Sequence, residues 1–290
     1  MTALPFAFAK EEYPLAPLTL YNVGGPARLA LFPGTVDEAC RACEWMLGRP
    51  GPKLVLGGGS NILVSDNGFD GIVLVTNGLD WIAPLGEGRY SAGGGTCLGR
   101  LVRDIMIPNN YGGVGGLAGI PGSVGGAIYM NAGTANGSTC QLLESVELVG
   151  AEGRRTVRMD PSLYSYRGQN FCSRETIILS GTFRFEPAGE DQRAIYDHYI
   201  QRRKEKQPQG HCCGSVFKNP EGDHAGRLIE ACGLKGARRG GAVISPVHAN
   251  FIMNEDNASF DDILGLITLC KRSVRERFDI ELEEEVVIVK

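Results

Sequence analysis

One short segment carries three side-chain groups that together suit polar chemistry. In GSVFKNP, residues 214–220, the Ser215 hydroxyl, the Lys218 ammonium and the Asn219 amide lie within five positions of one another. The flanking glycine and proline favour a rigid turn, on which these groups would bind a polar substrate or transfer a proton. Because Gly-Ser and Asn-Pro pairs also occur simply as turn formers, a turn without a chemical role is the alternative.

Arg167 is a second candidate, in the segment SYRGQNF at residues 165–171. A guanidinium is planar and binds a carboxylate or phosphate through two parallel hydrogen bonds. Small polar and apolar neighbours favour such a role here. An ordinary exposed arginine is the alternative, and it is the commoner setting for this residue type.

Two glycine-rich stretches are the strongest sign of a ligand. Residues 112–134 read GGVGGLAGIPGSVGGAIYMNAGT, and residues 53–65 read KLVLGGGSNILVS. The second predicts strand, tight loop and strand, whereas phosphate loops of the Walker and dinucleotide types open a helix. We expect both stretches to be loops whose N–H groups hold one diphosphate from two sides, with packed loops that bind nothing as the alternative.

Several elements that would position these residues are predicted by local signals. A helix is expected over residues 35–47 with Thr35 as its cap, and another over residues 225–232 with Gly233 just beyond it. Ser259 and Asp262 form a capping box for a late helix. A final strand over residues 280–289 would align Glu281, Glu283 and Glu285 on one face, with Glu285 lying deepest.

Composition excludes several classes of function. The 290 residues carry a net charge of −4, so no general basic field attracts nucleic acid. Neither a signal peptide nor an apolar run of about 20 residues is present, so we expect a cytoplasmic protein without membrane insertion. Nine scattered cysteines suit a reducing compartment, and four histidines lack metal-ligand spacing, so no metal is expected. Motifs for acyl transfer or zinc hydrolysis do not occur.

The order of the motifs along the chain closely resembles the UDP-N-acetylenolpyruvoylglucosamine reductase (MurB) family, in its shorter type II form. GIPGSVGGA and GSVFKNP are the most specific of them. The others, in family order, are GGGSNILVSDNGFDGIVL, SYR, KQP, AGRLIEACGLKG, HANFIMN and LEEEV.

The resemblance implies a three-domain α+β flavoprotein of the vanillyl-alcohol-oxidase/PCMH-type FAD-binding superfamily with a C-terminal α/β substrate domain. The expected domains are 1–77 and 78–206, which bind FAD, and 207–290, which binds substrate. The implied activity is UDP-N-acetylmuramate dehydrogenase: reduction of UDP-N-acetylglucosamine enolpyruvate with NADPH through non-covalent FAD, in peptidoglycan synthesis and hence cell wall biogenesis, cell shape and division. A monomer without a nucleic-acid partner is expected.

The family's functional residues carry over by motif position. The catalytic set is Ser215 as proton donor, Arg167 at the substrate carboxylate and Glu285 beside the substrate. The implied substrate-binding residues are Lys206, Lys218 and Asn219. Those implied for FAD are Gly57, Gly58, Gly59, Ser60, Asn61, Gly119, Ile120, Pro121, Gly122, Ser123 and Gly125.

Three positions depart from the family pattern, namely Gln169, Asn136 and Asn22. These departures leave open the details of the substrate loop and of the flavin edge. The role of the adjacent Cys212 and Cys213 is also open. Two other functions remain as alternatives. An oxidase of the same superfamily would often attach its flavin through a histidine or a cysteine, and no histidine lies in either glycine loop. A UDP-sugar sensor without activity would be expected to lose a catalytic residue, and all three are present.

Overall fold

The computed structural model describes residues 4–290, which divide into two compact units. The first takes in the chain up to residue 12 together with residues 28–58 and 70–201. The second consists of residues 13–27, 59–69 and 202–290. The chain therefore passes from the first unit to the second inside the GGGSN loop, between Gly58 and Gly59. The expected division into three domains stays a prediction.

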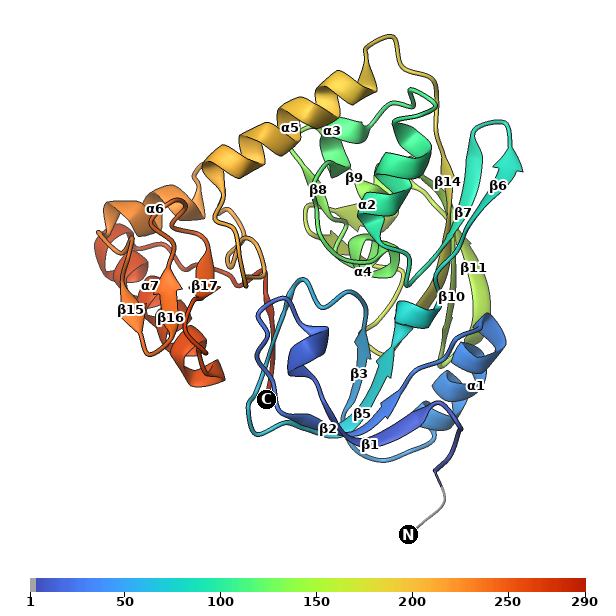
Figure 1. The fold of residues 1–290 in the computed structure, drawn as a ribbon, viewed down its shortest axis with the longest axis horizontal. Coiled ribbons are helices and arrows are strands. Elements are labelled where there is room, and N and C mark those ends of the chain that lie inside the picture. Colours follow the sequence, from blue (N-terminus) through green and yellow to red (C-terminus); the bar gives the residue numbers. More distant parts are fainter. Residues whose placement is uncertain (1–3) are drawn as a thin grey trace. The chain divides into compact units, whose positions relative to one another are not determined.

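Two sheets form the framework of the first unit (Figure 1). One is five-stranded and antiparallel, in the order β11-β10-β14-β7-β6. The other has the order β1-β2-β5-β3, with β3 and β5 parallel. Their bounds are Ala9–Pro14 (β1), Pro26–Leu31 (β2), Lys53–Leu56 (β3), Phe69–Val75 (β5), Ile82–Gly86 (β6), Arg89–Gly93 (β7), Leu143–Gly150 (β10), Gly153–Arg158 (β11) and Ile177–Arg184 (β14).

Helix α1, Val36–Leu47, packs against residues of both sheets. Its buried face consists of Ala39, Ala42, Cys43 and Met46, at the spacing of one side of a helix. Thr35 caps it by accepting a hydrogen bond from the backbone N–H of Glu38 at 3.2 Å, as predicted. On the sheets, Leu31 of β2, Leu74 of β5 and Ile177 of β14 lie in the same buried cluster as these helix residues.

The glycine-rich stretch 112–134 is not one continuous loop. It contains two short helices, because its apolar residues recur at helical spacing and bury one side. The smaller elements of this unit are α2 (Leu98–Arg100), a π-helical segment (Leu101–Met106), α3 (Val114–Leu117), α4 (Val124–Tyr129), β8 (Gly133–Thr134), β9 (Gly137–Ser138), β12 (Tyr164–Ser165), β13 (Gly168–Gln169) and α5 (Gln192–Lys206), whose end enters the second unit.

The second unit packs two helices around small strands and one continuous core. β4 (Ile62–Val64) pairs in parallel with β18 (Val287–Val289). β15 (Arg238–Arg239), β16 (Ala242–Ile244) and β17 (Ile252–Asn254) form an antiparallel sheet beside α6 (Ala225–Ala231) and α7 (Phe260–Phe278). The predicted capping box of α7 and the Gly233 conformation after α6 are both confirmed. The predicted final strand is wrong over residues 280–286, where only an isolated bridge at Glu284 is regular.

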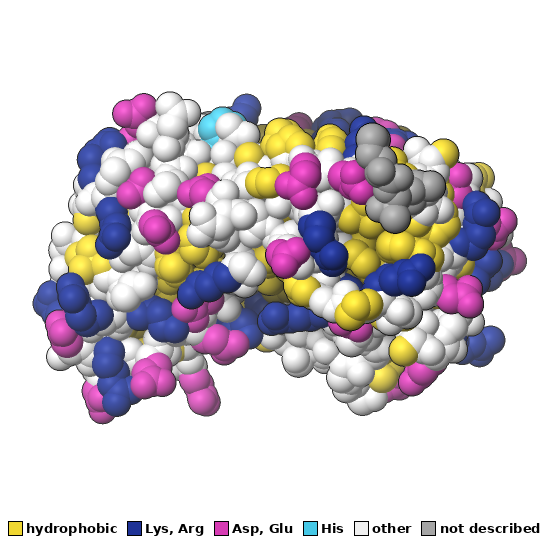
Figure 2. Space-filling model, turned by 90° about the horizontal axis from the view of Figure 1, so that it is seen from below, with side chains coloured by type: hydrophobic (Ala, Val, Ile, Leu, Met, Phe, Trp, Pro, Cys, Tyr) yellow, Lys and Arg dark blue, Asp and Glu magenta, His cyan; other side chains and the backbone are white. Residues whose placement is uncertain are grey.

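Positive and negative side chains are interspersed over the face shown in Figure 2, with apolar groups between them. No single-sign field covers that face, which agrees with the small net charge of −4. Within residues 4–290, the helices are either too short or too polar to cross a membrane.

Candidate active site

The two glycine-rich stretches meet inside the first unit. Gly57 and Gly58 follow β3, and Gly122 and Ser123 precede α4. A Cβ added to Gly58 would lie 2.8 Å from the Gly122 Cα and 2.9 Å from the Ser123 backbone nitrogen. Real Cβ atoms do not approach backbone so closely, and backbone cannot swing aside as a long side chain would. Glycine at position 58 is therefore what allows the two loops to touch.

Ser123 ties these loops together through its side chain. Its Oγ accepts hydrogen bonds from the N–H of Gly58 at 3.2 Å and of Gly126 at 3.3 Å, and the residue is only 3% exposed. A hydroxyl has two acceptor positions and one proton to donate. Both acceptor positions are occupied, and residues 4–290 provide no acceptor for the proton. An anionic oxygen fits this place, so the residues present fit the diphosphate of FAD.

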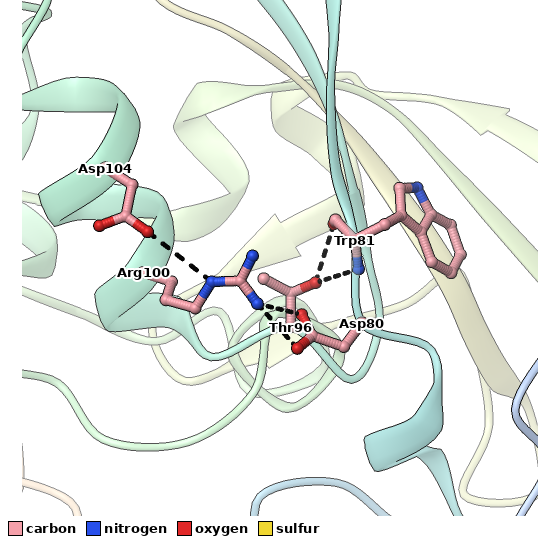
Figure 3. Close-up of polar contacts among 5 residues, drawn as sticks. All are labelled: Asp80, Trp81, Thr96, Arg100 and Asp104. Carbon is pink, nitrogen blue, oxygen red and sulfur yellow. Dashed lines mark hydrogen bonds and ion pairs between the residues drawn. The ribbon is translucent and has the colours of Figure 1, made fainter.

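The second glycine loop is supported from behind by Thr96 (Figure 3). This fully buried side chain accepts a hydrogen bond from the Trp81 N–H at 3.1 Å and donates one to the Trp81 carbonyl at 2.9 Å. The Thr96 carbonyl accepts from the N–H of Val124, the first residue of α4, at 2.7 Å. Thr96 thus connects the start of β6 to the start of α4, which fixes the loop that ends in Ser123.

Arg100 reinforces the same connection. It lies between two carboxylates in Figure 3, with Nη1 at 2.7 Å from both carboxylate oxygens of Asp80 and Nε at 3.7 Å from Asp104. Because Asp80 precedes Trp81 and Arg100 lies four residues after Thr96, the ion pair and the threonine join the same two segments. The side chains of Arg100 and Asp80 are about two-fifths exposed, so solvent screens much of their attraction.

Arg167 lies in the two-residue turn between β12 and β13, in the left-handed region with φ 55°. This conformation is uncommon for a residue other than glycine and costs on the order of 1 kcal/mol or more. Its guanidinium lies over the ring of Tyr166, 5.0 Å from the centroid. Such strain persists only where surrounding structure imposes it, and it often accompanies a functional residue.

Two amide side chains impose the shape of this hairpin. Asn131, only 4% exposed, donates to the Ser165 carbonyl at 2.8 Å and accepts from the Cys140 N–H at 3.1 Å. Gln169 Oε1 accepts from the N–H groups of Phe171 and Cys172, at 2.8 and 2.9 Å. The departure from the family pattern at position 169 therefore supplies a local anchor.

The other catalytic candidates lie in the second unit and are joined through backbone. Asn61 donates from its side-chain amide to the Glu285 carbonyl at 2.9 Å. The Glu285 N–H in turn donates to the carbonyl of Val216, the residue after Ser215, at 2.8 Å. Glu285 and Ser215 are both half-buried, whereas Glu281 and Glu283 are exposed. The structure therefore brings together the chain segments of Asn61, Ser215 and Glu285.

The predicted substrate-binding residues have contacts of their own within this unit. Lys218 forms an ion pair with Glu283. Asn219 accepts a hydrogen bond from the N–H of Ala225, at the start of α6, at 3.1 Å. Lys206 is the last residue of α5 and is exposed. Gly59, Ser60 and Asn61 belong to the second unit, whereas Gly119, Ile120, Pro121 and Gly125 belong to the first.

The adjacent cysteines are protonated thiols at neutral pH. Burial raises the pKa of Cys212 and, more strongly, that of Cys213. The Cys213 Sγ also donates to the Ile62 carbonyl at 3.3 Å. A thiol needs its thiolate form to act as a nucleophile or in disulfide exchange, so both are unreactive here. Residues 4–290 hold no group of three or more His, Cys, Asp or Glu side chains arranged to bind a metal ion.

Comparison with known proteins agrees with this arrangement. Residues 27–158 match an FAD binding domain, and residues 206–289 match the C-terminal domain of UDP-N-acetylenolpyruvoylglucosamine reductase. The reductase of that name from Desulforamulus reducens is 40% identical over 282 residues, covering 95% of this chain and 92% of its own. The chain belongs to the UDP-N-acetylenolpyruvoylglucosamine reductase family.

Other members support the same assignment over the whole length. The reductase from Chloroflexus aggregans is 38% identical and 99% of each chain is covered. The crystal structure of the Thermus caldophilus reductase (MurB) superposes with a TM-score of 0.81 at 33% identity, covering 97% of this chain and 98% of that one. The expected family and the α+β flavoprotein fold are confirmed.

Sequence reasoning missed the residues that position the site. Thr96, Asn131 and Asn250 are buried polar residues whose hydrogen bonds reach segments far away in the chain. Asn131 and Asn250 lie in the motifs AIYMNAG and HANFIMN, so a signal was present in the sequence. A buried amide cannot be assigned partners from sequence alone.

Proposed function

We propose that this chain reduces UDP-N-acetylglucosamine enolpyruvate to UDP-N-acetylmuramate with NADPH, through FAD, in the synthesis of peptidoglycan precursors. The observation that carries the proposal is the pair of glycine loops joined by Ser123, in a chain of the reductase family. The hydroxyl proton of Ser123 has no acceptor among residues 4–290. We also propose that the reaction takes place in the cytoplasm, since it uses NADPH and a UDP-sugar. The active form would be a monomer.

FAD would be held by residues 57–61, 119–123 and 125, without a covalent bond. When bound, it supplies the hydride that NADPH provides. The protein's own side chains would stabilise the negative charge that develops on the substrate and would supply the proton. A hydride added to the enolpyruvyl methylene carbon leaves negative charge on the neighbouring carbon and its carboxylate, and this charge needs a cation and an acid.

Ser215 would supply the proton to the carbon that bears the ether oxygen. It is half-buried and follows Gly214, whose φ of 74° places it on a tight turn. A serine hydroxyl is a weak acid, but the enolate that it would protonate is a strong base. Arg167 would hold the substrate carboxylate where the negative charge develops, and Glu285 would contact the substrate. Lys206, Lys218 and Asn219 would bind the rest of it.

The first experiment is the visible spectrum of the purified protein after incubation with FAD. We expect a flavin spectrum that NADPH bleaches and that the enolpyruvyl UDP-sugar then restores. A protein that stays colourless with FAD, or whose bleached flavin is not restored by this substrate, would refute the proposed function. Flavin remaining on acid-precipitated protein would contradict only the non-covalent part.

The second experiment tests the acid. Ser215→Ala should bind FAD and be reduced by NADPH like the wild type, because the hydroxyl takes no part in those steps. Flavin reoxidation by the UDP-sugar, followed by stopped flow, should slow by about 10²- to 10⁴-fold. Ser215→Cys keeps a proton donor and should recover part of the rate. Reoxidation of the alanine variant at the wild-type rate would show that another group supplies the proton.

A further inference from the structure

Asn250 holds the segment that follows Ser215. This residue is 3% exposed and lies just before β17. Its side chain pairs with both backbone groups of Phe217: Oδ1 accepts from the N–H at 2.9 Å, and Nδ2 donates to the carbonyl at 2.9 Å. Its own carbonyl accepts from the Val216 N–H at 2.8 Å. One asparagine thus replaces a neighbouring strand for two successive residues.

The opposite side of this segment is held by the residues around Glu285. The Val216 carbonyl accepts from the Glu285 N–H at 2.8 Å, and the Lys218 N–H donates to the Glu283 carbonyl at 2.9 Å. Residues 216–218 therefore lie between Asn250 on one side and residues 283–285 on the other. Removing Asn250 would release one side of the segment to which the backbones of both Ser215 and Glu285 are tied.

Before Ser215, the chain is anchored at Cys213, whose Sγ donates to the Ile62 carbonyl at 3.3 Å, and Gly214 separates this anchor from Ser215. Gly214 has φ 74°, and a Cβ built there would meet no atom within 4 Å. On the side that follows Ser215, the Val216 N–H and both backbone groups of Phe217 are bonded to Asn250. The position of the Ser215 hydroxyl thus depends on Asn250.

His248 keeps Asn250 in place from behind. Its Nδ1 accepts the Asn250 N–H at 3.2 Å, and its ring packs against Phe251 with the centroids 4.8 Å apart. Only an unprotonated Nδ1 accepts a hydrogen bond. Burial and the nearby Lys235 lower the pKa of His248, which keeps this acceptor available. Glu230 opposes that shift.

We propose that Asn250 is a positioning residue that places the Ser215 hydroxyl for proton transfer to the substrate carbon. The inference rests on the proposed role of Ser215 as the acid. Asn250 contacts backbone only, and the hydroxyl regains its proton from water after each turnover. A misplacement of about 1 Å costs on the order of 10²-fold in rate. The loss should fall on the substrate step alone.

Asn254 offers a matched control in the same unit. It is 9% exposed, donates to the Tyr21 carbonyl at 2.9 Å and accepts from the Ala258 N–H at 2.7 Å, so it also has two side-chain bonds to backbone. Neither bond touches residues 214–219. Asn250→Leu and Asn254→Leu should therefore lose similar stability, and only the first should disturb Ser215. Asn250→Asp and Asn254→Asp, which keep the side-chain shape, form a second pair if a leucine variant does not fold.

The test uses the FAD-loaded enzyme reduced by NADPH and then mixed with the enolpyruvyl UDP-sugar. We expect both variants to be reduced like the wild type and Asn250→Leu to be reoxidised about 10²-fold more slowly than Asn254→Leu. In D₂O, a fixed donor delivers deuterium to one face of the carbon. The Asn250 variant should therefore yield both configurations at the ether carbon, and the Asn254 variant only one, a difference that lost stability would not produce.

The outcomes separate the two proposals. If Ser215→Ala is slow but Asn250→Leu reoxidises as fast as Asn254→Leu with a single product configuration, the positioning role is refuted and Ser215 remains the acid. Equal slowing of reduction and reoxidation in the Asn250 variant would also refute it, because the defect would be general. If Ser215→Ala reoxidises at the wild-type rate, the role of the acid fails and the inference about Asn250 fails with it.

Discussion

Replacing Ser123 with alanine tests the joint between the two glycine loops. The change removes the Oγ that accepts from Gly58 and Gly126. The Gly126 bond is a helix cap, whose loss costs about 1 kcal/mol. The Gly58 N–H is half-buried, and losing its acceptor costs about another 1 kcal/mol. We therefore expect the free energy of unfolding to fall by about 2 kcal/mol.

The affinity for FAD tests the proposed role of Ser123 more directly than the free energy of unfolding does. If the serine proton is donated to a charged phosphate oxygen, its loss costs about 1.5–3 kcal/mol of binding free energy. The dissociation constant for FAD should then rise roughly 10- to 100-fold. Titration of FAD with quenching of flavin fluorescence measures this constant, and denaturant unfolding measures the stability.

Ser259→Ala is the matched control for this prediction. Ser259 also caps a helix, accepting from the Asp262 N–H at 3.1 Å, but it belongs to the second unit and lies outside the glycine loops. It should lose about 1 kcal/mol of stability and bind FAD like the wild type. The reasoning is refuted if Ser123→Ala binds FAD with wild-type affinity, or if Ser259→Ala weakens FAD binding by the same factor.

Three further predictions concern packing, redox chemistry and pH. Gly58→Ala should abolish tight FAD binding, because its Cβ would meet the backbone of the other loop. Gly34→Ala, whose Cβ would make only an ordinary contact at 3.6 Å, should bind FAD normally in the same titration. Normal FAD binding by Gly58→Ala would contradict the close approach of the two loops. Cys212→Ser and Cys213→Ser should keep NADPH-dependent turnover within about 2-fold of the wild type, because the raised pKa values of the two thiols exclude thiolate chemistry. Loss of activity in a variant that is still folded would contradict this. The pKa of His248 is lowered in the folded state from its ordinary 6.5, so its contribution to stability is present above pH 6.5 and is lost as pH falls through the folded pKa. Unfolding measured against pH should show a smaller decline over that range in His248→Gln, and an unchanged decline would refute the assignment.

Local signals sufficed wherever the interacting groups are close in sequence. The Thr35 cap, the Ser259 capping box and Gly233 after α6 depend on residues within one turn of a helix end, and all three were predicted. The final strand was predicted over residues 280–289 because its residues alternate, yet only Val287–Val289 forms a strand. A strand exists only where a partner lies beside it, and alternation does not supply the partner.

The glycine loop at residues 57–61 shows how long-range pairing decides architecture. The sequence predicted a strand on each side of it, and β3 and β4 are those strands. They do not pair with each other: β3 lies beside β5, whereas β4 lies beside β18, more than two hundred residues away. That choice sends the two halves of one short loop into different units, and it depends on which distant strand edges are available.

From the sequence alone come the family, the flavoprotein class and the identity of Ser215, Arg167 and Glu285 as candidates, because their motifs are local and in a specific order. Tertiary structure decided how those candidates are held. Ser123 acquires its two donors, Ser215 its support from Asn250 and Arg167 its left-handed turn only after distant segments pack together. Buried hydrogen-bonding groups require partners, but the amino-acid sequence does not show which of many distant groups will lie within hydrogen-bonding distance.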